Sequence, residues 1–111
     1  MHQRVLTVVR LIQKDLSRPL TLKEMAQAVG LSSSHLRALF KAETGMTPAQ
    51  YQKNLRLSEA QRLLETTFLN VQEIMARVGI NDASHFNRDF KRAYGSSPIR
   101  YRTIIESKRT Q

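Results

Sequence analysis

The chain has 111 residues, a length that fits one ordinary domain or two very small ones and excludes a large multidomain enzyme. Its 18 Lys and Arg outnumber its 9 Asp and Glu, so the formal net charge is +9 and the expected partner is a polyanion. The absence of cysteine excludes disulfides, a thiolate nucleophile and a cysteine-based zinc site, and it favours a reducing compartment such as a cytoplasm.

No stretch of the sequence approaches the roughly 18 uninterrupted apolar residues that a membrane span requires. Hydrophobic residues make up 41% and charged residues 24%, which is typical of a folded domain and not of a disordered polycation. We therefore expect a folded protein with no membrane partner.

The first predicted element is an amphipathic helix near the amino terminus. Its apolar residues recur at helical spacing: Val5, Val9, Ile12 and Leu16. Arg10 interrupts the apolar run and no small-residue cleavage site follows, so the segment is predicted to be a helix face and not a signal sequence. The run Ser17-Arg18-Pro19 is predicted to end this helix.

The remainder of the chain contains an internal repeat. Leu20–Met25 and Val29–Leu31 return 49 positions later as Leu69–Ile74 and Val78–Ile80, after which one inserted residue changes the offset to 50. In the new register, His35, Leu36, Phe40, Lys41, Gly45, Pro48 and Tyr51 match His85, Phe86, Phe90, Lys91, Gly95, Pro98 and Tyr101. Such a duplication predicts two structural units of one kind.

Each copy begins with the signals of a short helix. Thr21 and Asn70 are candidate N-caps, and Glu24 and Glu73 follow three residues later, where a carboxylate can reach back to the cap amide. The predicted helices end at matched glycines, because glycine tolerates the left-handed conformation of a tight turn. Those glycines are Gly30 and Gly79.

A second helix follows in each copy. It begins after Ser32 in the first copy and after Asn81 or Asp82 in the second, and it ends near Gly45 or Gly95. A short helix, a glycine-containing turn and a longer second helix describe a helix-turn-helix motif.

A third helix then starts where a hydroxyl precedes a proline, at Thr47-Pro48 and Ser97-Pro98. After Pro48, apolar residues continue at helical spacing to about Thr66 without a breaker, namely Tyr51, Leu55, Ala60, Leu63 and Leu64. This long helix would span about 28 Å, close to the roughly 34 Å of one turn of B-form DNA.

The predicted fold is all-α, with seven helices that form two helix-turn-helix subdomains joined by the long connecting helix. We assign residues 1–46 to the first subdomain, 47–66 to the connecting helix, and 67–111 to the second subdomain with its C-terminal helix and short basic tail.

The second helix of each copy has an outer face suited to DNA. On a helical wheel, Leu36, Leu39 and Phe40 point inward in the first copy, as do Phe86 and Phe90 in the second. The opposite faces hold Ser34, Arg37, Ala38 and Lys41, and Ser84, Asn87, Arg88 and Lys91. In a major groove, Arg can pair with a guanine edge and Asn with an adenine edge. The alternative is an ordinary solvated helix face.

Other residue types indicate no catalysis. His35 and His85 occupy matched flanking positions that favour a packing or phosphate contact, and no pair of carboxylates or histidines completes a metal site nearby. The aromatic residues sit at core spacing without interleaved basic residues, which disfavours stacking on single-stranded bases; they are Phe40, Phe86, Phe90, Tyr51 and Tyr101. We see no phosphate loop, nucleophile elbow or catalytic carboxylate pair, and expect neither an enzyme nor a cofactor.

From Val5 to Arg102 the chain resembles the DNA-binding domain of the AraC/XylS family of bacterial transcription regulators. The most specific segments are Gly79–Arg92 and Gly95–Arg102, and Arg56-Leu57, Ala60 and Leu63-Leu64 also fit the family pattern. The resemblance implies two recognition helices in successive major grooves of a bent duplex, an asymmetric site, a cytoplasmic, nucleoid-associated protein, and activation through RNA polymerase.

The resemblance also implies roles for particular residues. Those that would approach bases are Ser34, Arg37, Ala38, Ser84, His85, Asn87 and Arg88. Those that would hold phosphates are Lys41, Thr47, Lys91 and Ser97. Phosphate contacts set register and salt sensitivity, whereas base contacts choose sequence.

The second copy departs from the family pattern at two positions. Met75 stands where the family usually has Ala, and Ile80 follows the turn glycine where the family favours Phe. We expect altered spacing in the second motif, with the adaptable Met side chain filling an irregular gap.

Family members often carry a separate effector or dimerisation domain, which would lie outside this chain, whereas others are little more than the DNA-binding unit. A basic helical adaptor that binds an acidic protein is the main alternative function. A fragment of a DNA-repair alkyltransferase could only be a targeting part, since no cysteine is present to accept an alkyl group. The deep, narrow major groove of RNA would not admit these helices.

Overall fold

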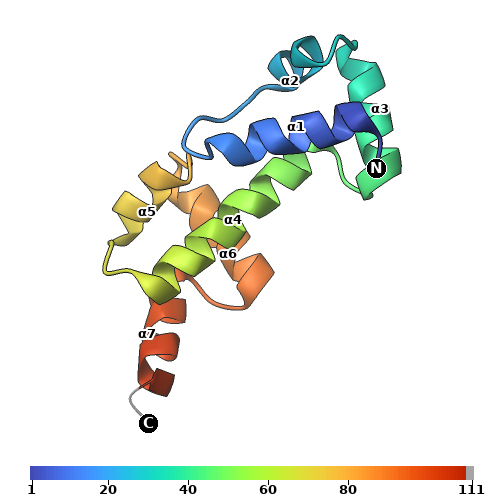
Figure 1. Ribbon diagram of the computed structural model, residues 1–111. Coiled ribbons are helices and arrows are strands. Elements are labelled where there is room, and N and C mark those ends of the chain that lie inside the picture. Colours follow the sequence, from blue (N-terminus) through green and yellow to red (C-terminus); the bar gives the residue numbers. More distant parts are fainter. Residues whose placement is uncertain (110–111) are drawn as a thin grey trace. The chain divides into compact units, whose positions relative to one another are not determined.

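The computed structural model describes residues 1–109, in which seven α-helices and no strand are present, as predicted (Figure 1). The helices are α1 (Gln3–Lys14), α2 (Leu22–Ala28), α3 (Ser33–Thr44), α4 (Pro48–Thr66), α5 (Val71–Arg77), α6 (Ala83–Tyr94) and α7 (Pro98–Arg109). The chain divides into two compact units, one from Met1 to Leu55 and one that begins at Arg56. None of these helices is long and apolar enough to cross a membrane.

Helix α1 ends earlier than the run Ser17-Arg18-Pro19. It stops at Lys14, because Asp15 adopts an extended conformation with φ −151° and ψ 96°. The Asp15 Oδ1 atom accepts hydrogen bonds from the Ser17 backbone N–H at 3.0 Å and from its hydroxyl at 2.5 Å. This local side-chain bonding competes with continuation of the helix. Leu16 therefore lies beyond α1, where it still packs against the core of the first unit.

Both predicted capping boxes are present. Thr21 Oγ1 accepts the Glu24 N–H at 3.1 Å, while the Glu24 carboxylate accepts the Thr21 N–H at 3.2 Å. Asn70 and Glu73 form the same pair of bonds at 2.8 and 3.0 Å. Two amides at each helix start are thereby satisfied, so α2 and α5 begin at matched positions.

The turn after each short helix is a Schellman motif. The Leu31 N–H donates to the Ala26 carbonyl at 3.0 Å, and the Ile80 N–H donates to the Met75 carbonyl at 2.9 Å. The intervening Gly30 and Gly79 have positive φ values of 69° and 74°. These bonds require a left-handed residue at that point, which explains the glycine in both copies.

The core of the first unit lies between α1, α2 and α3. Its buried residues are Val5, Val8, Val9, Ile12, Met25, Ala26, Leu36 and Phe40. Tyr51 and Leu55 of α4 pack against this cluster and are partly exposed. Leu39, which the helical wheel places inward, is likewise only half-buried.

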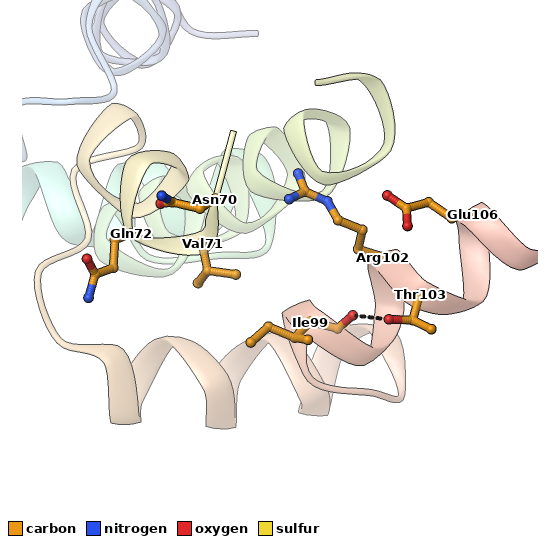
Figure 2. Close-up of a pocket in the computed structure, with 7 residues that line it drawn as sticks. All are labelled: Asn70, Val71, Gln72, Ile99, Arg102, Thr103 and Glu106. Carbon is orange, nitrogen blue, oxygen red and sulfur yellow. Dashed lines mark hydrogen bonds between the residues drawn. The ribbon is translucent and has the colours of Figure 1, made fainter. Parts of the chain in front are cut away.

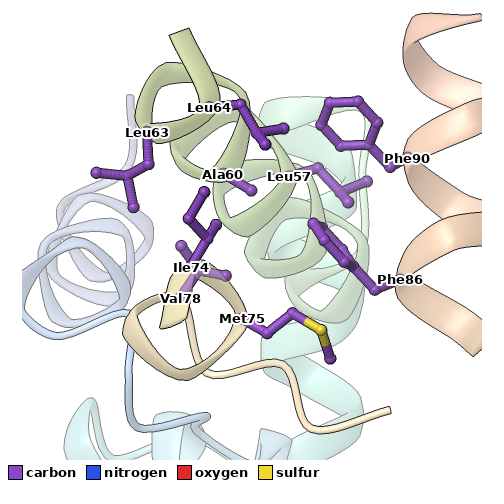
Figure 3. Close-up of a cluster of buried hydrophobic side chains, with 9 residues drawn as sticks. All are labelled: Leu57, Ala60, Leu63, Leu64, Ile74, Met75, Val78, Phe86 and Phe90. Carbon is purple, nitrogen blue, oxygen red and sulfur yellow. The ribbon is translucent and has the colours of Figure 1, made fainter. Parts of the chain in front are cut away.

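In the second unit, the later part of α4 occupies the role that α1 has in the first. The buried cluster comprises Leu57, Ala60, Leu63, Leu64, Ile74, Met75, Val78, Phe86 and Phe90 (Figure 3). Met75 is only 7% exposed, and Ile80 packs against the same cluster. Both departures from the family pattern are therefore part of this core.

Matched aromatic pairs join α3 to α4 and α6 to α7. Phe40 and Tyr51 meet edge to face with ring centroids 5.4 Å apart, and Phe90 and Tyr101 do so at the same distance. The Tyr101 hydroxyl donates to Glu65 Oε2 at 2.8 Å. Burial raises the pKa of Tyr101, and the bond to Glu65 raises it further. The predicted core role of these aromatic residues agrees with this packing.

The Met75 and Ile80 departures are expected to compensate for each other, since a larger side chain precedes the turn and a smaller one follows it. Met75→Ala should lower the free energy of unfolding by about 2 kcal/mol through lost packing. Ile80→Phe alone should lower it by about 1 to 3 kcal/mol through overpacking.

The double variant should lose less than the sum of these two values, by roughly 1 kcal/mol, because Phe can occupy the space that Met75 vacates. Urea denaturation followed by circular dichroism measures each value. Met75→Ala combined with Ile99→Ala, at an exposed position of α7, serves as the control pair and should be additive. An additive result for Met75→Ala with Ile80→Phe would contradict the compensation.

Candidate nucleic-acid interface

The two candidate recognition helices, α3 and α6, have 12 residues each and matched ends. Ser32 caps α3, and its hydroxyl accepts the His35 N–H at 3.1 Å. Of the two residues considered for the second copy, Asp82 is the cap of α6, and its Oδ1 accepts the His85 N–H at 3.0 Å. Both helices end at a left-handed glycine, as predicted.

Each recognition helix has one buried and one exposed face. Leu36 and Phe40 anchor α3, and Phe86 and Phe90 anchor α6, all at 1% exposure or less. All the side chains predicted to approach bases are exposed: Ser34, Arg37, Ala38, Ser84, His85, Asn87 and Arg88. The core thus holds each helix so that a polar, basic face is available to a ligand.

The residues predicted to hold phosphates fall into two classes. Lys41 and Lys91 are exposed in the last turns of α3 and α6. Thr47 and Ser97 are half-buried, and their hydroxyls accept the N–H groups of Gln50 and Arg100 at 3.2 and 3.3 Å. A hydroxyl that accepts a capping bond retains a hydrogen that can be donated to a phosphate oxygen.

Two predicted residues of the first unit line one small cavity. Arg37 of α3 and Thr47, just before α4, share a cavity of about 140 Å³ with Leu20 and Gln52. The structure therefore places a predicted base-reading cation and a predicted phosphate-binding hydroxyl around the same hollow.

Two carboxylates to which the sequence assigns no role at the site, Asp82 and Asp89, lie at the cap and within α6. Asp82 Oδ2 lies 3.3 Å from His85 Nδ1, and Asp89 Oδ1 lies 3.6 Å from Arg88 Nε. The hydrogen bond from the His85 backbone N–H holds the pKa of Asp82 below its usual value, and the charge of Arg88 acts in the same direction. Comparison of the two copies could have revealed both carboxylates, because the first copy has the uncharged residues Ser32 and Leu39 at the corresponding positions.

Two further positioning residues, Gln52 and Arg102, were not assigned from the sequence. Gln52 is buried in α4, and its amide donates to the Leu20 carbonyl at 3.0 Å and accepts the Leu20 N–H at 2.9 Å. Gln52 directly follows Tyr51, and Arg102 directly follows the matching Tyr101. These equivalent positions in the repeat could have revealed both residues.

Arg102 of α7 makes the corresponding connection in the second unit. Its guanidinium donates to the carbonyls of Leu64, Thr67 and Leu69 at 3.1, 3.3 and 2.5 Å. The contacts span the end of α4 and the segment before α5. Arg102 thus ties α7 to the loop that precedes α5.

A larger open cavity of about 400 Å³ lies between the start of α5 and α7 (Figure 2). Its lining residues are Asn70, Val71, Gln72, Ile99, Arg102, Thr103 and Glu106. None of the residues predicted to contact DNA lines it. Within residues 1–109, no group of three or more His, Asp or Glu side chains could hold a metal ion.

Comparison with known proteins identifies the same arrangement elsewhere. A family model described as a helix-turn-helix domain matches residues 25–104. The transcriptional activator NphR from a Rhodococcus species is 40% identical over 96 residues, which are 86% of this chain and 28% of that protein. The chain spans about a third of the length of the curated relatives it matches.

The fold of the chain is also similar to solved structures of DNA-binding domains. The crystal structure of the DNA-binding domain of AdpA, a global transcriptional factor, in complex with a target DNA matches with a TM-score of 0.92 and 29% identity, covering 99% of both chains. A transcriptional regulator with an AraC-type DNA-binding domain from Chromobacterium violaceum matches with a TM-score of 0.82 and 28% identity, covering 90% of this chain and 89% of that one.

Arg102→Ala should lower the free energy of unfolding by about 2 kcal/mol, because several carbonyl oxygens lose a charged donor. Arg102→Lys should recover less than half of this loss, since an ammonium cannot reproduce the fork of the guanidinium. Urea denaturation measures both values. Arg100→Ala, which removes an exposed Arg from the same helix, is the matched control, and an equal loss there would contradict the anchoring role.

Proposed function

Because the chain belongs to the AraC-type family of helix-turn-helix transcription regulators, we propose that it binds double-stranded promoter DNA with sequence specificity. In this proposal, α3 and α6 enter successive major grooves and read an asymmetric site. The observation that supports this proposal most directly is the matched pair of recognition helices, each with a buried apolar face and an exposed basic face. The chain itself performs no chemistry.

The exposed side chains supply two kinds of contact in this proposal. Lysines and hydroxyls bind phosphate oxygens, which places the protein on the duplex. Side chains in the first half of each helix meet base edges, where an arginine can form two bonds with guanine and an asparagine two bonds with adenine. The two outer faces differ, since Arg37 and Ala38 correspond to Asn87 and Arg88. Each half of the site would therefore have its own sequence.

We extend the proposal to the place and manner in which the chain would regulate transcription. We place the chain in the cytoplasm at the nucleoid, where it would activate transcription through contact with RNA polymerase. An effector or dimerisation domain would lie outside this chain. A basic adaptor for an acidic protein is the competing function, and it predicts no preference for duplex DNA.

Selection of bound duplexes from a random pool, repeated at low and near-physiological salt, tests the proposal. The expected result is an asymmetric motif of two blocks about one helical turn apart. A single block would contradict reading by both helices. Equal binding to all duplexes at both salt concentrations would contradict sequence specificity.

The salt dependence of binding should reflect phosphate contacts. With about six to ten contacts, the slope of log affinity against log salt should be roughly −5 to −9. Titration of the selected duplex at several salt concentrations, followed by fluorescence anisotropy, measures the slope. A slope near zero would contradict electrostatic binding of the DNA backbone.

Arg88→Ala should weaken binding to the selected site by about 1 to 3 kcal/mol and relax sequence choice at one position. Competition with duplexes that vary at each position measures both effects. Arg92→Ala removes an exposed charge from the same helix without changing the predicted base-reading set, so it is the matched control. Uniform weakening by Arg88→Ala on all duplexes would make Arg88 a phosphate contact instead.

A further inference from the structure

The caps of the two recognition helices differ in a way that affects the adjacent histidines. Ser32 presents one side-chain oxygen, which accepts the His35 N–H at 3.1 Å. Asp82 presents two oxygens, of which Oδ1 accepts the His85 N–H at 3.0 Å and Oδ2 lies 3.3 Å from His85 Nδ1. The side chains of His85 and Asp82 are 60% and 50% exposed, so the ring remains accessible to a ligand.

The Asp82 carboxylate restricts where the neutral His85 ring carries its proton. An aspartate of ordinary pKa is already ionised at neutral pH, and the backbone hydrogen bond from His85 lowers the pKa of Asp82 further. An ionised oxygen beside Nδ1 attracts an N–H group and repels a nitrogen lone pair. This contact favours the neutral ring with its proton on Nδ1, which leaves Nε2 as a hydrogen-bond acceptor.

We propose that Asp82 is a positioning residue for base reading, which holds His85 as the Nδ1–H tautomer so that Nε2 accepts a hydrogen bond from an exocyclic amino group. In the major groove, adenine N6 and cytosine N4 present such groups, whereas guanine O6 and thymine O4 are acceptors. His85 would thus select amino-bearing bases. This inference rests on the proposed function, because it specifies what one base-reading residue of α6 selects.

The charged residues near His85, namely Arg88 and Asp89, leave the contact between Asp82 and the His85 ring in place. Arg88 lies one turn further along α6, and Asp89 Oδ1 is 3.6 Å from its Nε, so this cation has a nearby carboxylate in addition to Asp82. In the first unit, the Ser32 hydroxyl already accepts the His35 N–H and lies 3.5 Å from the Ser34 hydroxyl. A serine cap has a single hydroxyl oxygen and no second oxygen beside the ring, so His35 provides an internal comparison.

Nitrogen NMR of the full chain with ¹⁵N-labelled histidine at pH 8 tests the tautomer of the neutral ring directly. His85 should be mainly the Nδ1–H form, and Asp82→Ser should return it to the tautomer mixture of a free imidazole. Ser32→Asp should shift His35 toward the Nδ1–H form. Both serine and aspartate cap helices, so these exchanges retain the cap. Identical ring-nitrogen shifts for His35 and His85 in the unaltered chain would overturn the proposal.

Duplex selection with Asp82→Ser at pH 8 tests the consequence for reading. Preference for adenine or cytosine should fall about fivefold at one position, the loss expected for one hydrogen bond. His85→Ala should relax the same position, while the remainder of the motif stays unchanged. An equal loss of affinity on all duplexes would show that Asp82 acts only as a cap and would overturn the proposal.

Duplex selection separates the DNA-binding function of the chain from the role of Asp82. A chain that selects no motif contradicts the proposed function and overturns the inference with it. A two-block motif that Asp82→Ser leaves unchanged supports the proposed function and overturns this inference alone.

Discussion

The left-handed glycine after the first helix of each motif is the constraint on which the recognition helices depend. At Gly30 and Gly79 the chain reverses, and a hydrogen bond of about 3 Å joins the residue after the glycine to a carbonyl one turn back. A Cβ on Gly30 would meet no atom within 4 Å, so backbone conformation, and not lack of space, excludes other residues. The turn returns Leu31 and Ile80 to the cores, and each recognition helix starts from that anchored point.

Around these turns, each unit completes a small core with few elements. In the first unit α1 covers the motif, and in the second unit the later part of α4 does so. Helix α4 therefore contributes Tyr51 and Leu55 to one core and Leu57–Leu64 to the other, which explains why its apolar residues do not form one simple stripe. A helix with apolar residues on more than one side is expected when it packs differently along its length. The predicted connecting helix thus also supplies side chains to the cores of both units.

The two copies share their scaffold and differ in the chemistry they expose. Caps, turns and the aromatic pairs recur at matched positions, because each is required to form the same local structure. The exposed face is free of that requirement, and there Arg37 is matched by Asn87 and Ala38 by Arg88. Residues on an exposed, ligand-contacting face can be substituted during evolution without disturbing the packing of the core. A duplicated scaffold with two different faces suits an asymmetric ligand.

The sequence by itself determined the helices, their order and most of their boundaries, since capping boxes, turn glycines and helical periodicity act within a few residues. It also determined which side chains of α3 and α6 are exposed, because the wheel positions of Phe40, Phe86 and Phe90 leave one outer face. Only the tertiary structure decided the contacts between distant residues: the Gln52 bonds to Leu20, the Arg102 bonds to the loop before α5, and the packing of Met75 and Ile80 in one cluster. These depend on how helices pack, and no local pattern specifies which distant carbonyl or cavity a side chain will meet.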